Sequence, residues 1–110
     1  MDMEFAIDAF AALAQESRMA IFRLLVREEP HGLPVGEISK RLAIVPSTLS
    51  GHLAVLKRSR LVKATRHQRE IHYAANLDAM GDLVRFMLED FCDGKVESCG
   101  DIASFIDRSR

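Results

Sequence analysis

The chain has 110 residues and a nearly balanced charge, with 15 basic and 16 acidic side chains and a formal net charge of -1. Its length predicts a single domain, residues 1–110, with a modest core that a partner subunit would help to complete. The N-terminus has no positive segment followed by an apolar core, and no apolar run could span a bilayer, so we expect a cytoplasmic protein without a membrane partner. In that compartment its two cysteines are expected to have a chemical role rather than to form a structural disulfide.

The first part of the chain predicts three helices. Apolar residues recur at helical spacing in residues 4–14, and residues 17–27 are apolar on nearly all sides, which predicts burial in the centre of the domain. Proline and glycine in residues 30–34 predict a turn, after which residues 35–42 form a short helix. Packing or dimer formation is the expected role of the first helix.

Residues 45–57 are the segment around which the rest is organised. Pro46 suits a first helical position, and Leu49, Leu53 and Leu56 share one face. The other face carries short or hydrogen-bonding residues: Ser47, Thr48, Ser50, Gly51 and His52. Such a face suits the floor of a DNA major groove, although the pattern alone also fits an ordinary amphipathic surface helix. His52 is expected to be either a DNA contact of this helix or a packing residue.

The distribution of charge favours the DNA-binding interpretation. From Ile38 to Arg69 the sequence has no Asp or Glu. The basic residues in that segment are Lys40, Arg41, Lys57, Arg58, Arg60, Lys63, Arg66 and Arg69. The rest of the chain therefore sums to -9, from 7 basic and 16 acidic residues. An acidic protein with one basic segment is expected to bind phosphate, and we include Lys57 and Arg58 among the expected DNA contacts.

A hairpin follows this helix. Residues 61–65 and 70–74 predict two strands, and the tip between them carries Arg66 and Arg69, which can reach a minor groove or flanking phosphates. The short link of residues 43–45 between two helices predicts a helix-turn-helix. The expected fold class is a mainly helical winged helix-turn-helix with a small β-hairpin wing.

Two cysteines lie at the end of a predicted last helix. Asn76 predicts its N-cap, the apolar repeat continues to Phe91, and Gly94 predicts a left-handed C-cap. A turn at Gly94 can bring Cys92 and Cys99 together, and a short terminal helix is expected at residues 102–106.

Paired thiolates select soft acceptors such as trivalent arsenic or antimony. Two thiolates suit methylarsenite, whereas arsenite needs a third ligand such as water, Asp93 or an external thiol. Two alternatives remain open: Cys92 is a small apolar packing residue, or Cys92 and Cys99 form a disulfide as a redox switch.

Several segments resemble the ArsR family of winged-helix repressors. They are residues 10–25, residues 46–56 with their Ser-x-His-Leu core, Leu61-Val62, and the Arg-x-x-Arg-x-Ile-x-Tyr of residues 66–73. The resemblance covers roughly residues 5–92. It implies a homodimer through the first and last helices, two recognition helices on an inverted repeat of double-stranded operator DNA, and repression that a ligand releases.

The resemblance also narrows the sensor site. Many members hold arsenic or cadmium with a Cys-Val-Cys at the third helix, where this chain has Pro34, Val35 and Gly36. The zinc site of other members needs histidines on the last helix, and residues 76–91 contain none. Residues 91–99 resemble a subgroup of arsenic-responsive repressors with a cysteine pair and a third cysteine at the end of the last helix.

In that subgroup pattern Cys92 and Cys99 fit the first and last positions, and Asp93 occupies the second. We therefore expect a sensor segment at about residues 91–100 that binds arsenite, methylarsenite or antimonite as inducer, with no permanently bound cofactor and no enzymatic activity. A small thiol oxidoreductase and an interaction module without DNA binding are the alternatives of another class. The first lacks a Cys-x-x-Cys motif, and it leaves the basic segment unexplained.

Overall fold

The computed structural model describes residues 2–95 and residue 100. The elements are α1 (Met3–Leu13), α2 (Glu16–Arg27), β1 (Leu33–Pro34), α3 (Val35–Leu42), α4 (Pro46–Arg58), β2 (Val62–His67), β3 (Glu70–Ala75), α5 (Leu77–Phe86) and a π-helical turn, η1 (Met87–Phe91). The chain is mainly helical with a small antiparallel sheet, so the predicted winged helix-turn-helix is confirmed.

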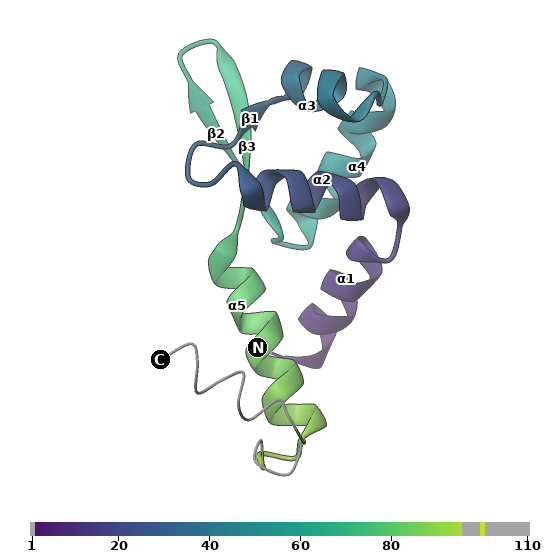
Figure 1. Cartoon of the computed structure of the whole chain (residues 1–110), viewed down its shortest axis with the longest axis vertical. Coiled ribbons are helices and arrows are strands. Elements are labelled where there is room, and N and C mark those ends of the chain that lie inside the picture. Colours follow the sequence, from purple (N-terminus) through teal and green to yellow (C-terminus); the bar gives the residue numbers. More distant parts are fainter. Residues whose placement is uncertain (1, 96–99, 101–110) are drawn as a thin grey trace.

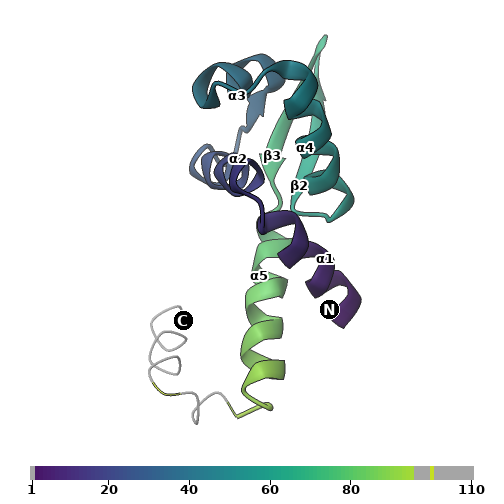
Figure 2. The same cartoon turned by 90° about the vertical axis from the view of Figure 1, so that its right-hand side faces the viewer.

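The molecule is elongated, with extents of 48 × 26 × 22 Å. α3, the start of α4 and the hairpin of β2 and β3 lie at one end, and α5 projects to the other (Figure 1). α1 also leaves the central body on the α5 side, as the turned view shows (Figure 2). The fold therefore separates two ends that can have different partners.

The core lies between α2, α3, α4 and the sheet. Its largest fully buried side chains are Ile21, Leu25, Ile38, Leu49, Leu53, Leu56 and Leu61. Three of these are the predicted apolar face of α4, so that prediction is confirmed. Because that face is held in the core, the opposite face of α4 is held toward solvent.

Local signals in the sequence explain where the helices begin. Asp2, Gln15 and Asn76 each accept a hydrogen bond from a backbone N–H three residues ahead, at the starts of α1, α2 and α5. These bonds satisfy amides that have no partner within the helix. α4 has no such side-chain bond and begins instead with Pro46, as predicted.

The sheet has a third strand that the sequence did not predict. β1 pairs antiparallel with β3, and the strand order is β1-β3-β2. Gly32 precedes β1 with a φ of +69°, and a Cβ there would lie 2.4 Å from the Tyr73 carbonyl oxygen. A two-residue strand is too short to produce an alternating pattern, which is why residues 30–34 indicated only a turn.

The hairpin is longer than predicted. β2 and β3 pair from Val62 opposite Ala75 to His67 opposite Glu70, so Arg66 lies in a strand rather than in the loop. Gln68, with a φ of 59°, follows β2 directly and begins the reversal of the chain. The turn between the strands therefore contains fewer residues than the predicted tip, residues 66–69.

The last helix changes its hydrogen bonding before the cysteine. α-Helical geometry ends at Phe86, and the π-helical turn ends at Phe91, where the apolar repeat predicted the end. The predicted left-handed conformation occurs at Gly94, with a φ of 70°, and begins one residue earlier at Asp93, with a φ of 53°. The expected terminal helix at residues 102–106 and Cys99 lie outside the described residues. Within the described residues no helix is long and apolar enough to cross a membrane.

Candidate DNA-binding interface

Local hydrogen bonds and one left-handed residue hold the turn between α3 and α4. Ala43 adopts a left-handed conformation with a φ of 54°. The Ser39 hydroxyl donates to the Ile44 carbonyl oxygen at 2.5 Å, and the Ile44 N–H donates to the Ser39 carbonyl oxygen at 3.2 Å. These contacts define how α4 leaves α3, which is the geometry that a helix-turn-helix needs.

The N-terminal half of α4 presents a polar surface without carboxylates. Ser47, Thr48, Ser50 and Gly51 are all exposed, and no atom lies within 4 Å of where a Cβ on Gly51 would be. Four of the predicted DNA contacts therefore lie together at one end of the helix. Their short side chains let the helix backbone approach base edges, and their hydroxyls can donate to or accept from bases and phosphates.

Two small apolar residues extend this surface and were missed in the sequence. Val45, just before α4, is 62% exposed, and Ala54 is exposed one turn after Gly51. Methyl groups of this kind can contact the C5-methyl of thymine in a major groove. Helical spacing from Ser47 and Gly51 places Ala54 on the same face, but alanine and valine lack the polarity that marks an exposed position in the sequence.

His52 lies at the edge of this surface. Its side chain is half-buried, and its Nδ1 lies 3.4 Å from Nη1 of Arg18 in α2. The structure therefore places the His52 side chain against Arg18, which is consistent with the packing role expected as one of its two alternatives.

Lys57 and Arg58 are exposed, but they lie at the far end of α4. From Ser47 to Arg58 the helix rises about 16 Å. Arg58 lines a cleft of about 370 Å³, together with acidic residues from the N-terminal end of α1. In the same region the Arg60 guanidinium lies 5.2 Å from the centre of the Phe5 ring, a cation–π distance. Part of the basic segment thus faces α1 rather than the polar end of α4.

Arg41 is partly neutralised by acidic neighbours. It forms an ion pair with Glu28, and its Nε donates to a Glu37 carboxylate oxygen at 2.9 Å. The hydrogen bond from Arg41 lowers the pKa of Glu37, and the hydrogen bonds to Glu37 and Glu28 raise the pKa of Arg41. Counting charges along the sequence therefore overstates the positive field near α3, since Glu28 comes from outside the acid-free segment.

The hairpin tip carries the remaining predicted contacts. Arg66 and Arg69 are exposed, and Arg66 Nε donates to the Gln68 carbonyl oxygen at 3.0 Å across the turn. The His67 and His72 rings lie on the same hairpin with centroids 4.4 Å apart. The tip and α3 are at the same end of the molecule (Figure 1). The tip is therefore placed to contact the same DNA duplex as the start of α4.

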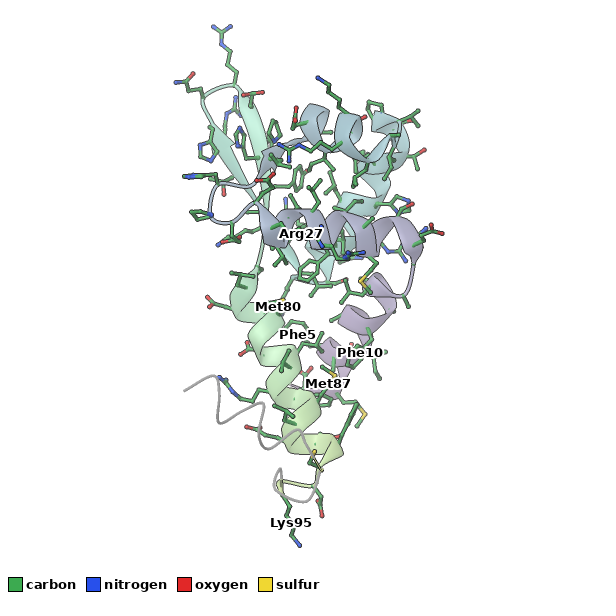
Figure 3. The ribbon with its side chains drawn as sticks, viewed as in Figure 1. Phe5, Phe10, Arg27, Met80, Met87 and Lys95 are labelled. Atoms are coloured by element: carbon green, nitrogen blue, oxygen red, sulfur yellow. The ribbon has the colours of Figure 1, made fainter. Side chains whose placement is uncertain are left out.

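The predicted sensor segment is only partly described. Cys92 is 7% exposed, directly follows η1 and is disulfide-bonded, whereas Cys99 lies outside the described residues. Within residues 2–95 and at residue 100 there is no group of three or more His, Cys, Asp or Glu side chains that could hold a metal ion. Lys95 lies beyond the end of the helix (Figure 3).

Large apolar side chains remain exposed on α1, α5 and η1. Phe5, Phe10, Met80 and Met87 lie between α1 and the α5–η1 helix (Figure 3). Beyond them the exposed residues are Met3, Ile7, Leu77, Val84 and Phe91. We call these exposed residues of α1, α5 and η1 the apolar surface, and the three elements that carry it lie on the side of the molecule away from the hairpin tip (Figure 1).

Comparison with known proteins agrees with this arrangement. A helix-turn-helix domain model matches residues 13–64. An uncharacterised HTH-type transcriptional regulator, YbzH of Bacillus subtilis, is 31% identical over 93 residues, covering 74% of this chain and 93% of YbzH. The transcriptional activator HlyU of Vibrio cholerae is 31% identical over 87 residues, covering 79% of this chain and 78% of HlyU.

Solved structures show the same fold. An ArsR-like transcriptional regulator from Rhodococcus has a TM-score of 0.72 at 24% identity and covers 91% of this chain and 93% of its own. HlyU of Vibrio cholerae has a TM-score of 0.63 at 29% identity, and the match covers 79% of this chain and 95% of HlyU. The homodimeric winged helix-turn-helix domain of Mb0332 from Mycobacterium bovis has a TM-score of 0.65 at 23% identity. The match covers 87% of this chain and 85% of the Mb0332 domain.

Proposed function

Because this chain belongs to a family of helix-turn-helix transcriptional regulators and has the fold of an ArsR-like regulator, we propose that it is a dimeric repressor of the ArsR family that holds operator DNA and releases it through a cysteine sensor directly after η1. It is a DNA-binding regulator and not an enzyme. The operator, the direction of regulation and the inducer are the parts that we propose.

One observation carries the proposal for operator binding. The exposed N-terminal half of α4 combines short polar side chains with a complete absence of carboxylates, and the cationic hairpin tip lies at the same end of the molecule. Ser47 and Ser50 would read base edges in a major groove, while Arg66 and Arg69 would contact phosphate or the minor groove. A protein-interaction module has no need of this combination.

The apolar surface of α1, α5 and η1 supports a dimer. Ile7 is 57% exposed and Phe91 is 66% exposed, and large side chains of this kind are covered by a partner in stable assemblies. The homodimeric state named for Mb0332 is consistent with the same arrangement. A two-fold axis through this surface would present two α4 helices to successive major grooves of an inverted repeat.

The inducer that we propose is a trivalent arsenical bound by Cys92 and Cys99. Thiolates are the soft ligands that such a species prefers, and the left-handed residues Asp93 and Gly94 turn the chain directly after Cys92. Because Cys92 adjoins the helix that carries part of the dimer surface, ligand binding there could change the spacing of the two α4 helices. Two thiolates satisfy methylarsenite, whereas arsenite needs a third ligand.

A redox switch is the second candidate, and a specific observation favours it. Cys92 is disulfide-bonded, which is the oxidised state that such a switch requires. HlyU has also been solved in a form named as reduced, a description that applies to that protein. Oxidation would replace the arsenical as the signal while leaving the DNA-binding end and the dimer unchanged.

Operator release measured by fluorescence polarisation separates these chemistries. The reduced protein is bound to a labelled duplex from its own promoter and titrated with methylarsenite, arsenite or peroxide under anaerobic, metal-free conditions. We expect release at lower concentrations of methylarsenite than of arsenite, and no release of Cys92→Ser or Cys99→Ser. Operator affinity of both variants should stay close to that of the wild type, because neither residue lies at the DNA-binding end.

Asp93→Asn is the matched control for the third ligand. It should weaken the response to arsenite and leave the response to methylarsenite unchanged. Release of the operator by peroxide alone would support the redox switch instead. If arsenicals still released the operator from the variant that carries both Cys92→Ser and Cys99→Ser, a thiol sensor would be excluded, since the chain has only 2 cysteines. A wild-type protein that does not shift its own promoter would contradict the repressor proposal.

A further inference from the structure

Arg18 connects three helices through one guanidinium group. It belongs to α2, its Nε donates to the Ala12 carbonyl oxygen of α1 at 2.7 Å, and its Nη1 lies 3.4 Å from His52 Nδ1 of α4. A guanidinium has donors and no acceptor, so the imidazole accepts at Nδ1 and its proton is on Nε2. The DNA-facing helix is thereby linked to a helix of the apolar surface.

The α1 side of this link is firmly held. Ala12 is 2% exposed, and its carbonyl belongs to the last turn of α1, where helices lack internal partners. α1 has no basic residue of its own in that turn, so the guanidinium also complements the negative end of the helix. The Arg18 backbone is fixed as well, because its N–H donates to the Gln15 side-chain oxygen at 2.8 Å.

The α4 side of the link lies next to the DNA-facing surface. His52 follows the exposed Ser50 and Gly51 and precedes Leu53, which is 1% exposed and anchored in the core. The contact therefore acts on α4 at the border between its buried and exposed faces. A rotation of α4 about its own axis would move Ser50 and Gly51 and would break the hydrogen bond with Arg18.

We propose that Arg18 is a positioning residue for operator binding, which fixes the orientation of α4 relative to α1 by holding Ala12 and His52 with the same side chain. The inference rests on the proposed operator-binding function. Arg18 contacts no DNA in this arrangement, and His52 serves the link instead of reading a base. Movement of α1 within the dimer would reach the recognition surface through this guanidinium.

A double-mutant cycle in the full-length protein tests the coupling. The ammonium of Arg18→Lys lacks the planar fork that spans both partners, and His52→Leu removes the acceptor while keeping an apolar side chain. Operator affinity is measured on duplexes that the wild-type protein selects from random DNA. Each single variant should weaken binding about fivefold per protomer, the value of one net hydrogen bond, and the double variant should be no weaker than the singles.

Three readouts distinguish positioning from a general loss of structure. His52→Asn offers an acceptor near the position of Nδ1 and should restore operator affinity to within about twofold of wild type. Such a difference corresponds to less free energy than one net hydrogen bond contributes. The slope of log affinity against log salt should not change, because neither Arg18 nor His52 neutralises a phosphate in this arrangement. Arg23→Lys, a conservative change at an exposed arginine of the same helix, should have no effect.

Several results would overturn the proposal. Singles whose effects multiply in the double variant would show that Arg18 and His52 are not coupled. An altered base preference in His52→Leu would show that His52 reads DNA directly. If Arg18→Lys does not fold, the comparison of His52→Asn with His52→Leu still decides, and equal affinities of those two variants would reject the link. A wild-type protein that selects no DNA sequence would overturn the proposed function as well, whereas the other failures leave it intact.

Discussion

The two ends of this molecule solve different problems with the same kinds of residues. At the end formed by α3, α4 and the hairpin, apolar side chains such as Leu49 and Ile38 are fully buried, and the exposed residues are mostly polar, with Val45 and Ile71 as the large apolar exceptions. At the end formed by α1, α5 and η1, Met3 is 59% exposed and Ile7 is 57% exposed. Among the described residues the first end exposes two large apolar side chains, whereas α1, α5 and η1 expose five, and a second chain can cover that area.

Charge divides the molecule in a similar way. Carboxylates outnumber arginines in two clefts on the side of α1 and α5. One cleft has Asp2, Glu4 and Asp8 with Arg58 and Arg60, and the other has Asp82, Glu89 and Asp90 with Arg85. The exposed start of α4 has neither carboxylates nor basic residues, and the hairpin tip carries Arg66 and Arg69 beside Glu70. This distribution favours approach of DNA to the hairpin end, because carboxylates outnumber arginines in both clefts on the other side. A net charge near zero thus hides two opposed surfaces.

The largest effect is expected where two neighbours on α5 have opposite environments. Leu83 is 5% exposed in the core of the chain, and Val84 is 37% exposed. Leu83→Ala should lower the free energy of unfolding by about 3 kcal/mol, because it removes packed atoms and leaves a cavity. Val84→Ala should leave the stability of the protomer nearly unchanged. Urea unfolding of both variants provides the measurement, and equal losses would remove the distinction between core and surface on α5.

The next prediction separates folding from association. Ile7→Asp places a charge on the exposed apolar surface of α1 and should produce folded monomers. Operator affinity should then fall by at least about tenfold, because a monomer can occupy only one half-site. Sedimentation at micromolar concentration measures the association state, and His31→Asp, in an exposed turn outside α1 and α5, is the control. A wild-type protein that remains monomeric would contradict the proposed dimer.

A smaller effect is expected at the hairpin tip. Arg69→Ala should weaken binding to all DNA sequences alike and reduce the salt slope by about 1 for each phosphate that the arginine neutralises, because released counterions carry that term. Arg66→Ala should act in the same direction and should also loosen the turn, since Arg66 donates to the Gln68 carbonyl. Arg85→Ala on α5 is the control and should leave the slope unchanged. An unchanged slope in Arg69→Ala would mean that the tip does not reach the duplex.

The smallest effect concerns the ion pair beside α3. The hydrogen bond from Arg41 lowers the pKa of Glu37 below its ordinary value of 4.5, so the pair stabilises the folded state above that pH. This contribution is lost as the pH falls through the lowered pKa. Glu37→Gln should therefore slightly reduce stability at neutral pH and have less effect in acid. Urea midpoints across this range would reveal the trend, and a larger effect of the substitution in acid would contradict the sign.

Local signals in the sequence were enough for the elements that depend on neighbouring residues. Periodicity and the proline at position 46 located α3 and α4 close to their observed boundaries, and Asn76 was confirmed as the N-cap of α5. The short polar residues of α4 were also placed on the exposed face, because the leucines at three- and four-residue spacing could only face the core. Such signals depend only on residues within one segment, so the sequence of that segment is enough to predict its local structure.

The packing of the whole chain was needed to show which of the candidate residues act together. The two-residue β1 exists because β3 lies beside it, and the pairing of Arg41 with Glu28 joins residues of separate elements. Likewise, Arg58 lines a cleft with α1, and His52 contacts Arg18, whereas the sequence predicts a DNA contact for Arg58 and leaves His52 as a DNA contact or a packing residue. Charge and periodicity describe a residue by its own segment. Its partner depends on the packing of segments that are distant in the sequence, and that packing assigns a basic or polar side chain to DNA or to the protein itself.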